Sequence, residues 1–519
     1  MHRARRSFGW LLPAAIWFSV CPCGALGGER GASFTLALES IRCEQLKGHV
    51  DYLADDALEG REPGSAGGRE AGQYLAEKLE EIGLRGAGVD GGFLQPFEPD
   101  YRNVLGLLRG SDPELAQQYV VVGAHYDHLG YGTNRNSRGQ VGQIHNGADD
   151  NASGTSALLE VAEAFTLLPE APKRSILFVL WDAEEKGMLG SKHWIGHPTL
   201  SLEQVDVLVN VDMVGRLRND RLMLYGSRSG YGWRRLASHG NEEAGLELEF
   251  PWDLKGNGDH WPFFDEGIPV LMLHTGLHDD YHCPTDDAHL INVEGMGRVT
   301  RLLFAIAYDL ANCDAVPEFR RAARQEVTYP RRPQPEESPQ TPARLGVEWQ
   351  EERPSDDGVR LTRVAAGSPA EQAGLQPGDR IVEFAGRMIQ TSDDLSWAVA
   401  SGENPVRIKV RRNGRDQPLE LTGRLEGRPL PLGILWRVEE AEPGALVVAH
   451  VVRGSPAAQA GLKPGDYIYQ IAGRDFADEA QFIELVKTLP APVTLLVERD
   501  GRLRTVEVPV DPQSQKRAA

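Results

Sequence analysis

Apolar residues along the N-terminal part of the chain follow two alternating patterns. Short, mostly apolar runs have the length of buried strands and lie at residues 119–123, 175–181, 205–211 and 268–273. Between and after them, apolar residues recur at helical spacing at 155–168 and 293–310. The segment 33–84 also reads as helical, and Gly83 provides a stop near its end. Buried strands separated by helices predict an α/β fold in which a mainly parallel central sheet is flanked by helices.

The pattern changes after this domain, which we place at residues 33–312. Prolines crowd among charged residues between about 314 and 343. This composition predicts an extended, semi-rigid linker at 313–342.

A repeat follows the linker. The segment Gly-Ser-Pro-Ala-Glu-Gln-Ala-Gly-Leu-Gln-Pro-Gly-Asp at 367–379 recurs with few changes 87 residues later, at 454–466. The tripeptide at 345–347 recurs at 432–434, with the same offset. The unit is too long for a solenoid repeat and suits an independent β-rich module. We therefore expect two copies of one small domain and then a disordered tail, at 343–424, 430–511 and 512–519.

The N-terminus has the features of an export signal. Arg3, Arg5 and Arg6 precede a short apolar run at 10–20, and small residues follow it. The run is too short for a comfortable membrane span. We therefore expect removal of residues 1–25, export to the periplasm or the cell exterior, and no stable membrane insertion afterwards. A retained N-terminal anchor is the alternative.

Composition narrows the class of partner. The formal net charge is −20, so nucleic acid and anionic membrane surfaces would repel the chain. A hydrophobic content of 41% is enough for ordinary globular cores. The charge therefore argues against a nucleic-acid or anionic-membrane partner and otherwise indicates a well-solvated surface.

Candidate metal ligands follow the predicted strands. His125 comes two residues after the run at 119–123, and Asp212 directly after the run at 205–211. The carboxyl ends of parallel strands are where open α/β sheets place their sites. Imidazole and carboxylate ligands suit zinc or a similar divalent metal. The full set of predicted ligands is His125, Asp150, Glu185, Asp212 and His282.

Charge favours two metal ions over one. Asp150, Glu185 and Asp212 would converge as three negative charges, which repel one another in a dry pocket. Two divalent cations, bridged by Asp150, would neutralise them and favour a bridging hydroxide as the nucleophile. Glu184 precedes a predicted ligand, so we expect it to carry protons as the general base. Asp127 is expected to orient the imidazole of His125.

Other polar residues near these motifs have weaker signals. Asp149 reads equally well as a loop cap or as support for the ligands. His128 and His145 read as loop histidines. For Asp259 and His260, lining the pocket and a purely structural role both remain open.

Four motifs in order resemble a known family. They are Ala-His-Tyr-Asp at 124–127, Gly-Ala-Asp-Asp-Asn-Ala-Ser-Gly at 147–154, Ala-Glu-Glu-Lys-Gly-Met-Leu-Gly-Ser at 183–191 and Asn-Val-Asp-Met at 210–213. Over roughly residues 40–312 the chain resembles the co-catalytic zinc peptidases of the bacterial leucyl aminopeptidase and aminopeptidase Y type.

The resemblance implies two zinc sites. One holds His125, Asp150 and Asp212, and the other holds Asp150, Glu185 and His282. Cobalt and manganese are alternative metals. Glu184 is the implied general base, and the peptide bond between Asp150 and Asn151 is expected to be cis. The tyrosine that holds the reaction oxyanion in some members has no confident counterpart in the sequence.

The repeats resemble the PDZ domains of bacterial envelope proteases. The resemblance implies that two loops bind the carboxylate of a peptide C-terminus through backbone N–H groups, with the peptide added as a strand. An alternative is that one or both modules only pack against the catalytic domain. The loop residues are Leu345, Gly346, Val347, Leu432, Gly433 and Ile434.

We therefore expect an exported dinuclear zinc aminopeptidase whose PDZ pair binds peptide C-termini or positions substrates. A carboxypeptidase of the same fold is the first alternative. It would need a cationic patch, for which the sequence offers only Arg216 and Arg218 near the motifs. A non-catalytic PDZ scaffold with an inactive hydrolase domain is the second, and the retention of Glu184 with every ligand speaks against it.

Overall fold

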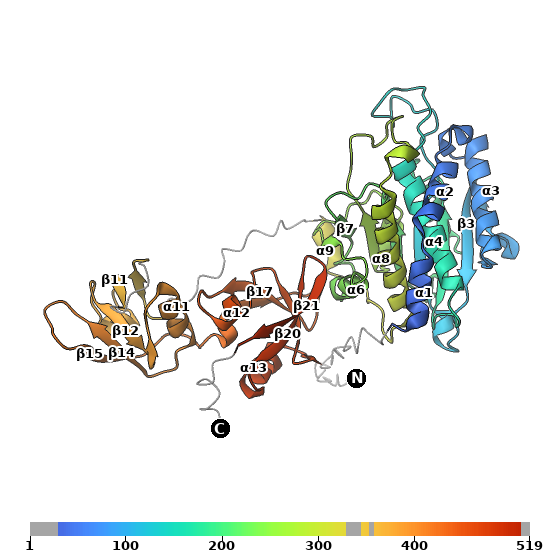
Figure 1. The fold of residues 1–519 in the computed structure, drawn as a ribbon. Helices are drawn as coiled ribbons and strands as arrows, with labels where there is room; N and C mark the ends of the chain where they lie inside the picture. The colour runs from blue at the N-terminus through green and yellow to red at the C-terminus, as the bar shows by residue number, and fades with distance from the viewer. Residues whose placement is uncertain (1–29, 329–343, 352–357, 510–519) are drawn as a thin grey trace, which may run out of the picture.

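The computed structural model describes residues 30–328, 344–351 and 358–509. The predicted signal peptide at 1–25, residues 329–342 of the predicted linker and the predicted tail at 512–519 lie outside the described residues. Figure 1 shows three bodies in a row, with the second repeat module between the α/β domain and the first repeat module. None of the described helices is both long and apolar enough to cross a bilayer.

The α/β domain is built on a nine-stranded sheet with the order β1-β3-β5-β4-β6-β9-β7-β8, and β2 pairs with β3. The four central strands run parallel, whereas β3 and β7 flank them in antiparallel orientation. The predicted α/β class with a parallel sheet is confirmed at the centre of the domain. The strands are β1 (Arg85–Gly86), β2 (Leu94–Phe97), β3 (Tyr101–Leu108), β4 (Tyr119–His125), β5 (Ser175–Trp181), β6 (Val205–Val211), β7 (Arg221–Tyr225), β8 (Glu247–Glu249) and β9 (Val270–His274).

Helices cover both faces of the sheet. The central strands β4 and β5 are therefore buried along their whole length and have no face exposed to solvent. One face packs against α1 (Ala32–Ser40), α2 (Cys43–Leu53), α3 (Ala66–Glu81), α4 (Gly154–Thr166), α6 (Trp233–Gly240) and α8 (Val293–Asn312). The other face packs against α5 (Leu189–Gly196), α7 (His260–Glu266) and α9 (Ala323–Thr328).

Two segments differ from the simplest reading of the sequence. The helical segment 33–84 is three helices, because the backbone is extended at Arg42 and left-handed at Glu59, Gly60 and Arg61. The start of the predicted linker, residues 313–328, contains α9 and packs on the domain, where Arg320 is fully buried.

The two repeat modules each form a six-stranded antiparallel sheet with two helices. Their strand orders, β10-β11-β12-β14-β15 and β16-β17-β18-β20-β21, are equivalent. The sixth strand of each sheet, β13 or β19, pairs with β12 or β18. The first module contains β10 (Val347–Trp349), β11 (Val359–Val364), α10 (Pro369–Gln372), β12 (Arg380–Phe384), β13 (Arg387–Met388), α11 (Ser392–Ser401), β14 (Val406–Arg411) and β15 (Leu419–Gly423). The second contains β16 (Ile434–Val438), β17 (Leu446–Val451), α12 (Pro456–Gln459), β18 (Tyr467–Ile471), β19 (Arg474–Asp475), α13 (Glu479–Thr488), β20 (Val493–Arg499) and β21 (Arg502–Val508).

Candidate metal centre

The candidate ligands lie at one edge of the central sheet. His125 ends β4, while Glu185 and Asp212 follow the neighbouring parallel strands β5 and β6. Asp150 lies in the turn that leads into α4, and His282 lies in the loop after β9. Parallel neighbours bring their carboxyl ends together, so residues far apart in the sequence converge in one pocket.

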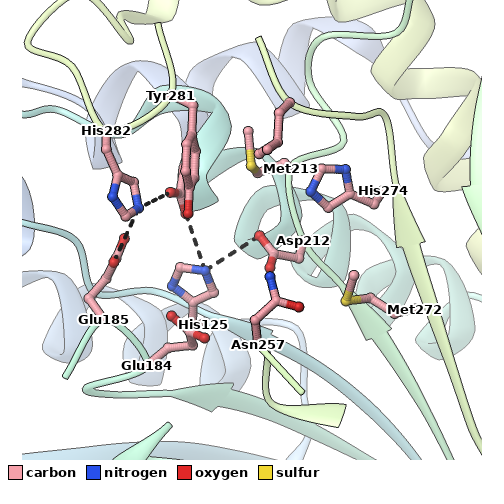
Figure 2. A pocket seen from close by; sticks show the side chains of 12 residues that line it. His125, Glu184, Glu185, Asp212, Met213, Asn257, Met272, His274, Tyr281 and His282 are labelled. Carbon is pink, nitrogen blue, oxygen red and sulfur yellow. Dashed lines mark ion pairs between the residues drawn. The ribbon is translucent and has the colours of Figure 1, made fainter. Parts of the chain in front are cut away.

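Asp150 lies between two histidines. Its Oδ1 is 3.3 Å from Nε2 of His125, and its Oδ2 is 3.2 Å from Nε2 of His282. Asp212 approaches His125 at 3.5 Å, and Glu185 approaches His282 at 3.3 Å. Figure 2 shows Glu185 with His282 on one side of His125 and Asp212 on the other. This geometry gives two adjacent ligand clusters that share one carboxylate.

The peptide bond between Asp150 and Asn151 is cis, as the resemblance implied.

His128 belongs to the second cluster, which the sequence did not indicate. Its side chain is fully buried, and Nδ1 lies 2.9 Å from Oε1 of Glu185 and 3.9 Å from Oδ2 of Asp150. Its other nitrogen, Nε2, is buried without a hydrogen-bond partner. The interpretation of His128 as a loop histidine therefore missed this contact. The signal was its place three residues after His125, in the loop that follows β4.

The donor set fits divalent cations. His125, Asp150 and Asp212 offer ligand atoms within 4.8 Å of one another, and so do His128, Asp150 and Glu185. Oδ1 of Asp212 is buried and lacks a hydrogen-bond partner. Burial opposes protonation of His125, but its contacts with the carboxylates of Asp127, Asp150 and Asp212 outweigh burial and raise its pKa well above the usual value. Cations at these positions would replace protons as the balancing positive charge.

Glu184 lines the same pocket and is not part of either ligand cluster. Its backbone N–H and that of Glu185 donate to the two carboxylate oxygens of Asp127, at 3.0 and 3.2 Å. The carboxylate of Asp127 is 3.7 Å from Nδ1 of His125, whereas the backbone carbonyl of Asp127 is nearer, at 3.2 Å. Asp127 therefore holds the Glu184–Glu185 segment as well as lying beside the imidazole.

Arg61 connects the loops that carry the ligands through hydrogen bonds to their backbone. The side chain is fully buried and donates to the backbone carbonyls of Tyr126, Asn146 and Gly147, at 2.7, 2.6 and 3.0 Å. These carbonyls flank the segments that carry Asp127 and Asp150. Burial lowers the pKa of Arg61 to about 10, with the negative charges of Asp127 and Asp150 acting in the opposite direction. No sequence pattern indicated this role, because Arg61 lies outside every motif.

Asp286 supports Asp150 from another loop. Its carboxylate accepts the backbone N–H groups of Asp149 and Asp150, at 3.0 and 3.1 Å. Asp149 itself accepts the N–H of Gly215 at 2.6 Å and lies 3.1 Å from His278. Asp149 thus supports the ligand loop, which settles the open choice between a cap and a supporting residue.

Other polar residues lie around the pocket and do not enter it. The carboxylate of Asp259 is buried and accepts the hydroxyl hydrogen of Ser191 at 2.5 Å. His260 is buried, with Nε2 2.8 Å from the carbonyl of Lys255. His145 is also buried and contacts Ser137.

The remainder of the pocket is lined by three apolar side chains and three polar ones. Met213, Met272, Leu277, Asn257, His274 and Tyr281 complete the lining (Figure 2). Burial, together with the charges of Asp150 and Glu185, raises the pKa of Tyr281, so its hydroxyl keeps its proton and can donate a hydrogen bond. No lysine or arginine of the described chain lines this pocket.

The two arginines named as a cationic patch are engaged elsewhere. Arg216 pairs with Asp280 at 2.8 Å. Arg218 donates to the backbone carbonyls of Gly276 and Leu277, at 3.2 and 2.9 Å.

The predicted carboxylate-binding loops belong to the repeat modules. Leu345, Gly346 and Val347 lead into β10, whereas Leu432, Gly433 and Ile434 lead into β16.

Comparison with known proteins agrees with this arrangement. Residues 103–307 match Peptidase family M28, and residues 360–412 and 447–499 match the PDZ domain. Aminopeptidase YwaD of Bacillus subtilis is 28% identical over 231 residues, which cover 42% of this chain and 46% of YwaD. Leupeptin-inactivating enzyme 1 of Streptomyces exfoliatus is 26% identical over 272 residues, which cover 51% of this chain and 56% of that enzyme. The chain thus spans about half the length of these curated relatives.

A solved structure, the LapA aminopeptidase of Legionella pneumophila, superposes with a TM-score of 0.46 at 20% identity and covers 61% of this chain and 81% of LapA. The family matches rest on the sequence, and the described fold places their motifs in one pocket and in two repeated modules. The chain therefore contains a peptidase family M28 domain, followed by two PDZ domains that we call PDZ1 (344–424) and PDZ2 (430–509).

Proposed function

We propose that the chain is an exported, dinuclear zinc aminopeptidase. The observation that carries the proposal is the place of Asp150 between two histidines, each with a second carboxylate beside it. His125, Asp150 and Asp212 would hold one ion, and Asp150, Glu185 and His282 the other. When bound, the two cations would polarise the scissile carbonyl and lower the pKa of water.

Glu184 has the position of a proton carrier. It lines the pocket beside the ligands, and Asp127 fixes its backbone. Its carboxylate would take a proton from the attacking water and deliver it to the leaving amine. Tyr281, whose hydroxyl stays protonated, is a candidate donor to the oxygen on which negative charge develops.

The residues that line the metal pocket favour binding of the substrate's N-terminal residue over its C-terminal residue. A carboxypeptidase needs a cation for the free carboxylate of its substrate, and no described lysine or arginine lines the pocket. Arg216 and Arg218 are occupied by neighbouring groups. Met213, Met272 and Leu277 suit an apolar side chain at the N-terminus of the substrate.

Glu184→Gln tests the reaction assigned to the pocket. The substitution keeps the shape of the side chain and removes its basicity, so turnover of leucyl-p-nitroanilide should fall by about 10²–10⁴-fold. Metal content, measured by mass spectrometry of the purified protein, should not change. N-acetylated and C-terminally extended substrates separate the two exopeptidase classes, because an aminopeptidase requires the free amine. Unaltered turnover by Glu184→Gln, or faster cleavage of N-acetylated substrates, would overturn the proposal.

Export and peptide binding complete the proposal. Residues 1–25 would direct export, which N-terminal sequencing of the mature protein from periplasmic and culture fractions tests. A mature protein that begins at Met1 in the cytoplasm would contradict it.

The PDZ domains would bind peptide C-termini and so bring substrates to the peptidase domain.

A further inference from the structure

PDZ2 is docked on the peptidase domain through α6 and β8 (Figure 1). Two backbone–backbone hydrogen bonds and one side chain–backbone hydrogen bond are among those that join the two domains. Gly232 N–H donates to the carbonyl of Ala441, and Leu248 N–H donates to that of Asp500. The side chain of Asn241 donates to the carbonyl of Gly501 at 2.8 Å. Such bonds fix the position of one domain on the other.

Arg234 is the centre of this contact. Its guanidinium donates to both carboxylate oxygens of Glu498, at 2.6 and 3.2 Å, and Glu498 is fully buried. The same group lies 4.0 Å from the ring centre of Tyr467 and 4.3 Å from that of Phe250. A bidentate pair stacked between aromatic rings is a geometry that lysine could not replace.

Further charges surround Arg234 at the start of α6. Glu442, which is buried, accepts the backbone N–H of Arg234 at 2.7 Å and so caps the helix from the other domain. Arg235 pairs with Asp475 at 2.8 Å. Arg228 pairs with Glu439 across the same contact.

PDZ1 lacks the residues that make this contact. At the positions 87 residues earlier, Glu498 is replaced by Arg411, Tyr467 by Arg380 and Asp475 by Met388. Arg411 would place a second positive charge opposite Arg234. The repeat sequence therefore explains why the second copy docks on the peptidase domain and the first does not.

The carboxylate-binding loops of the two modules also differ. In PDZ1, Gly346 and Val347 are partly exposed, and the N–H of Gly346 has no hydrogen-bond acceptor among the described residues. In PDZ2, Gly433 and Ile434 are buried, and their N–H groups donate to the carbonyls of Leu430 and Pro431. The PDZ2 loop has therefore used within itself the donors that a peptide carboxylate needs.

PDZ1 covers the PDZ2 loop. A Cβ atom at Gly433 would lie 3.1 Å from the ring of Trp397, which belongs to α11 of PDZ1. A Cβ atom at Gly454, in the repeated turn of PDZ2, would lie 2.6 Å from the carbonyl oxygen of Asp393 in the same helix. The N–H of Leu430 donates to the carbonyl of Ala400, at the end of α11. A peptide C-terminus could reach the PDZ2 loop only if PDZ1 moved away.

We propose that PDZ1 alone binds peptide C-termini, while PDZ2 is docked on the peptidase domain and connects PDZ1 to it. The ligand is a peptide with a free C-terminal carboxylate, because the partly exposed loop of PDZ1 offers the unpaired N–H of Gly346 to an anion at a strand end. The inference rests on the peptide binding proposed above and does not depend on the peptidase reaction.

A matched pair of glycine substitutions tests the inference in the full-length protein. Gly346 and Gly433 both have left-handed φ angles, +76° and +81°, and an added Cβ would meet the equivalent serine at 2.4 and 2.1 Å. Alanine therefore strains both loops against the equivalent serine, and at Gly433 the added Cβ also meets the ring of Trp397 in PDZ1 at 3.1 Å. The probe is a pool of heptapeptides with random apolar C-termini. An N-terminal fluorescein on each peptide supplies the signal and blocks aminopeptidase cleavage.

Fluorescence polarisation should show binding that weakens at least tenfold when the peptides are C-terminally amidated. Gly346→Ala should weaken binding at least tenfold, and Gly433→Ala should change it less than twofold. Equal losses in both variants, or a loss with Gly433→Ala only, would overturn the inference. No carboxylate-dependent binding by the wild type would overturn peptide capture itself, whereas aminopeptidase turnover would be unaffected.

A measurement on the unmodified chain guards against misfolding of Gly346→Ala. The same peptides with a photo-reactive C-terminal region are cross-linked to the wild type, and the sites are mapped by mass spectrometry. Cross-links should fall within residues 344–401 of PDZ1. Cross-links at 431–488 of PDZ2 would contradict the inference.

Discussion

The metal pocket and the PDZ pair relate sequence to structure in opposite ways. In the pocket, dissimilar segments such as those around His125 and His282 converge, and Asp150 lies between both histidines. In the PDZ pair, nearly identical segments 87 residues apart reach different surroundings, so that Gly346 is partly exposed and Gly433 is buried. The comparison teaches that a motif defines possible chemistry, while neighbouring residues decide whether the chemistry is accessible.

Removing the side chain of Arg61 should have the largest effect on stability. The loss should be confined to the peptidase domain and should leave the PDZ pair unchanged. Arg61→Ala deletes a buried guanidinium that donates to several backbone carbonyls. We expect a loss of about 3 kcal/mol or more in the unfolding free energy of the peptidase domain, because buried acceptors lose charged donors. Urea unfolding followed by tryptophan fluorescence measures it.

Arg61→Lys serves as the control for charge. Lysine keeps the positive charge but lacks the planar fork, so it should recover only part of the loss. Full recovery would show that charge alone supports the ligand loops.

Substituting His128 should have a smaller effect and should separate the two ligand clusters. His128→Asn removes the imidazole that lies 2.9 Å from Glu185 and leaves His125 untouched. We expect the affinity for the ion of the second cluster to fall about 10–100-fold, as for other residues that orient ligands. Calorimetric titration of the metal-free protein with Zn²⁺ measures the two affinities.

His145→Asn is the matched control, since His145 is also buried but contacts Ser137 and not Glu185. Equal effects of the two substitutions on zinc affinity would show that His128 has no specific part in zinc binding.

Breaking the contact between PDZ2 and the peptidase domain should have the smallest effect on turnover. PDZ2 would then, like PDZ1, no longer be docked on the peptidase domain. Glu498→Gln preserves shape and removes the charge that pairs with Arg234. Turnover of small aminoacyl substrates should change less than twofold, because the contact is outside the pocket. The radius of gyration from X-ray scattering should increase as PDZ2 leaves α6. Glu507→Gln, a carboxylate of β21 that forms no described ion pair, is the control.

The sequence predicted the part of the molecule in which local pattern and chemistry agree. The apolar runs at 175–181 and 205–211 coincide with β5 and β6, and their polar successors Glu185 and Asp212 lie in one pocket. A strand that is buried on both faces is mostly apolar, so its boundaries and its ligand-bearing end are both visible in the sequence.

The remainder depends on contacts between distant residues. Arg61 reaches the carbonyl of Asn146, and no local pattern predicts this hydrogen bond. The equivalence suggested for the two PDZ loops did not anticipate that Trp397 of one module would cover Gly433 of the other. The replacement of Glu498 by Arg411 was present in the sequence, but its meaning required knowledge of Arg234 as the partner.

Metal counting tests the central claim most directly. The protein is stripped with chelator, reloaded with Zn²⁺, desalted and measured by inductively coupled plasma mass spectrometry. We predict two zinc ions per wild-type chain and almost none in Asp150→Asn, because Asp150 is the carboxylate shared by both clusters. Asp279→Asn, an exposed neighbour of the same pocket loop as His282, should retain both ions. A single ion per wild-type chain, or two ions retained by Asp150→Asn, would contradict the account.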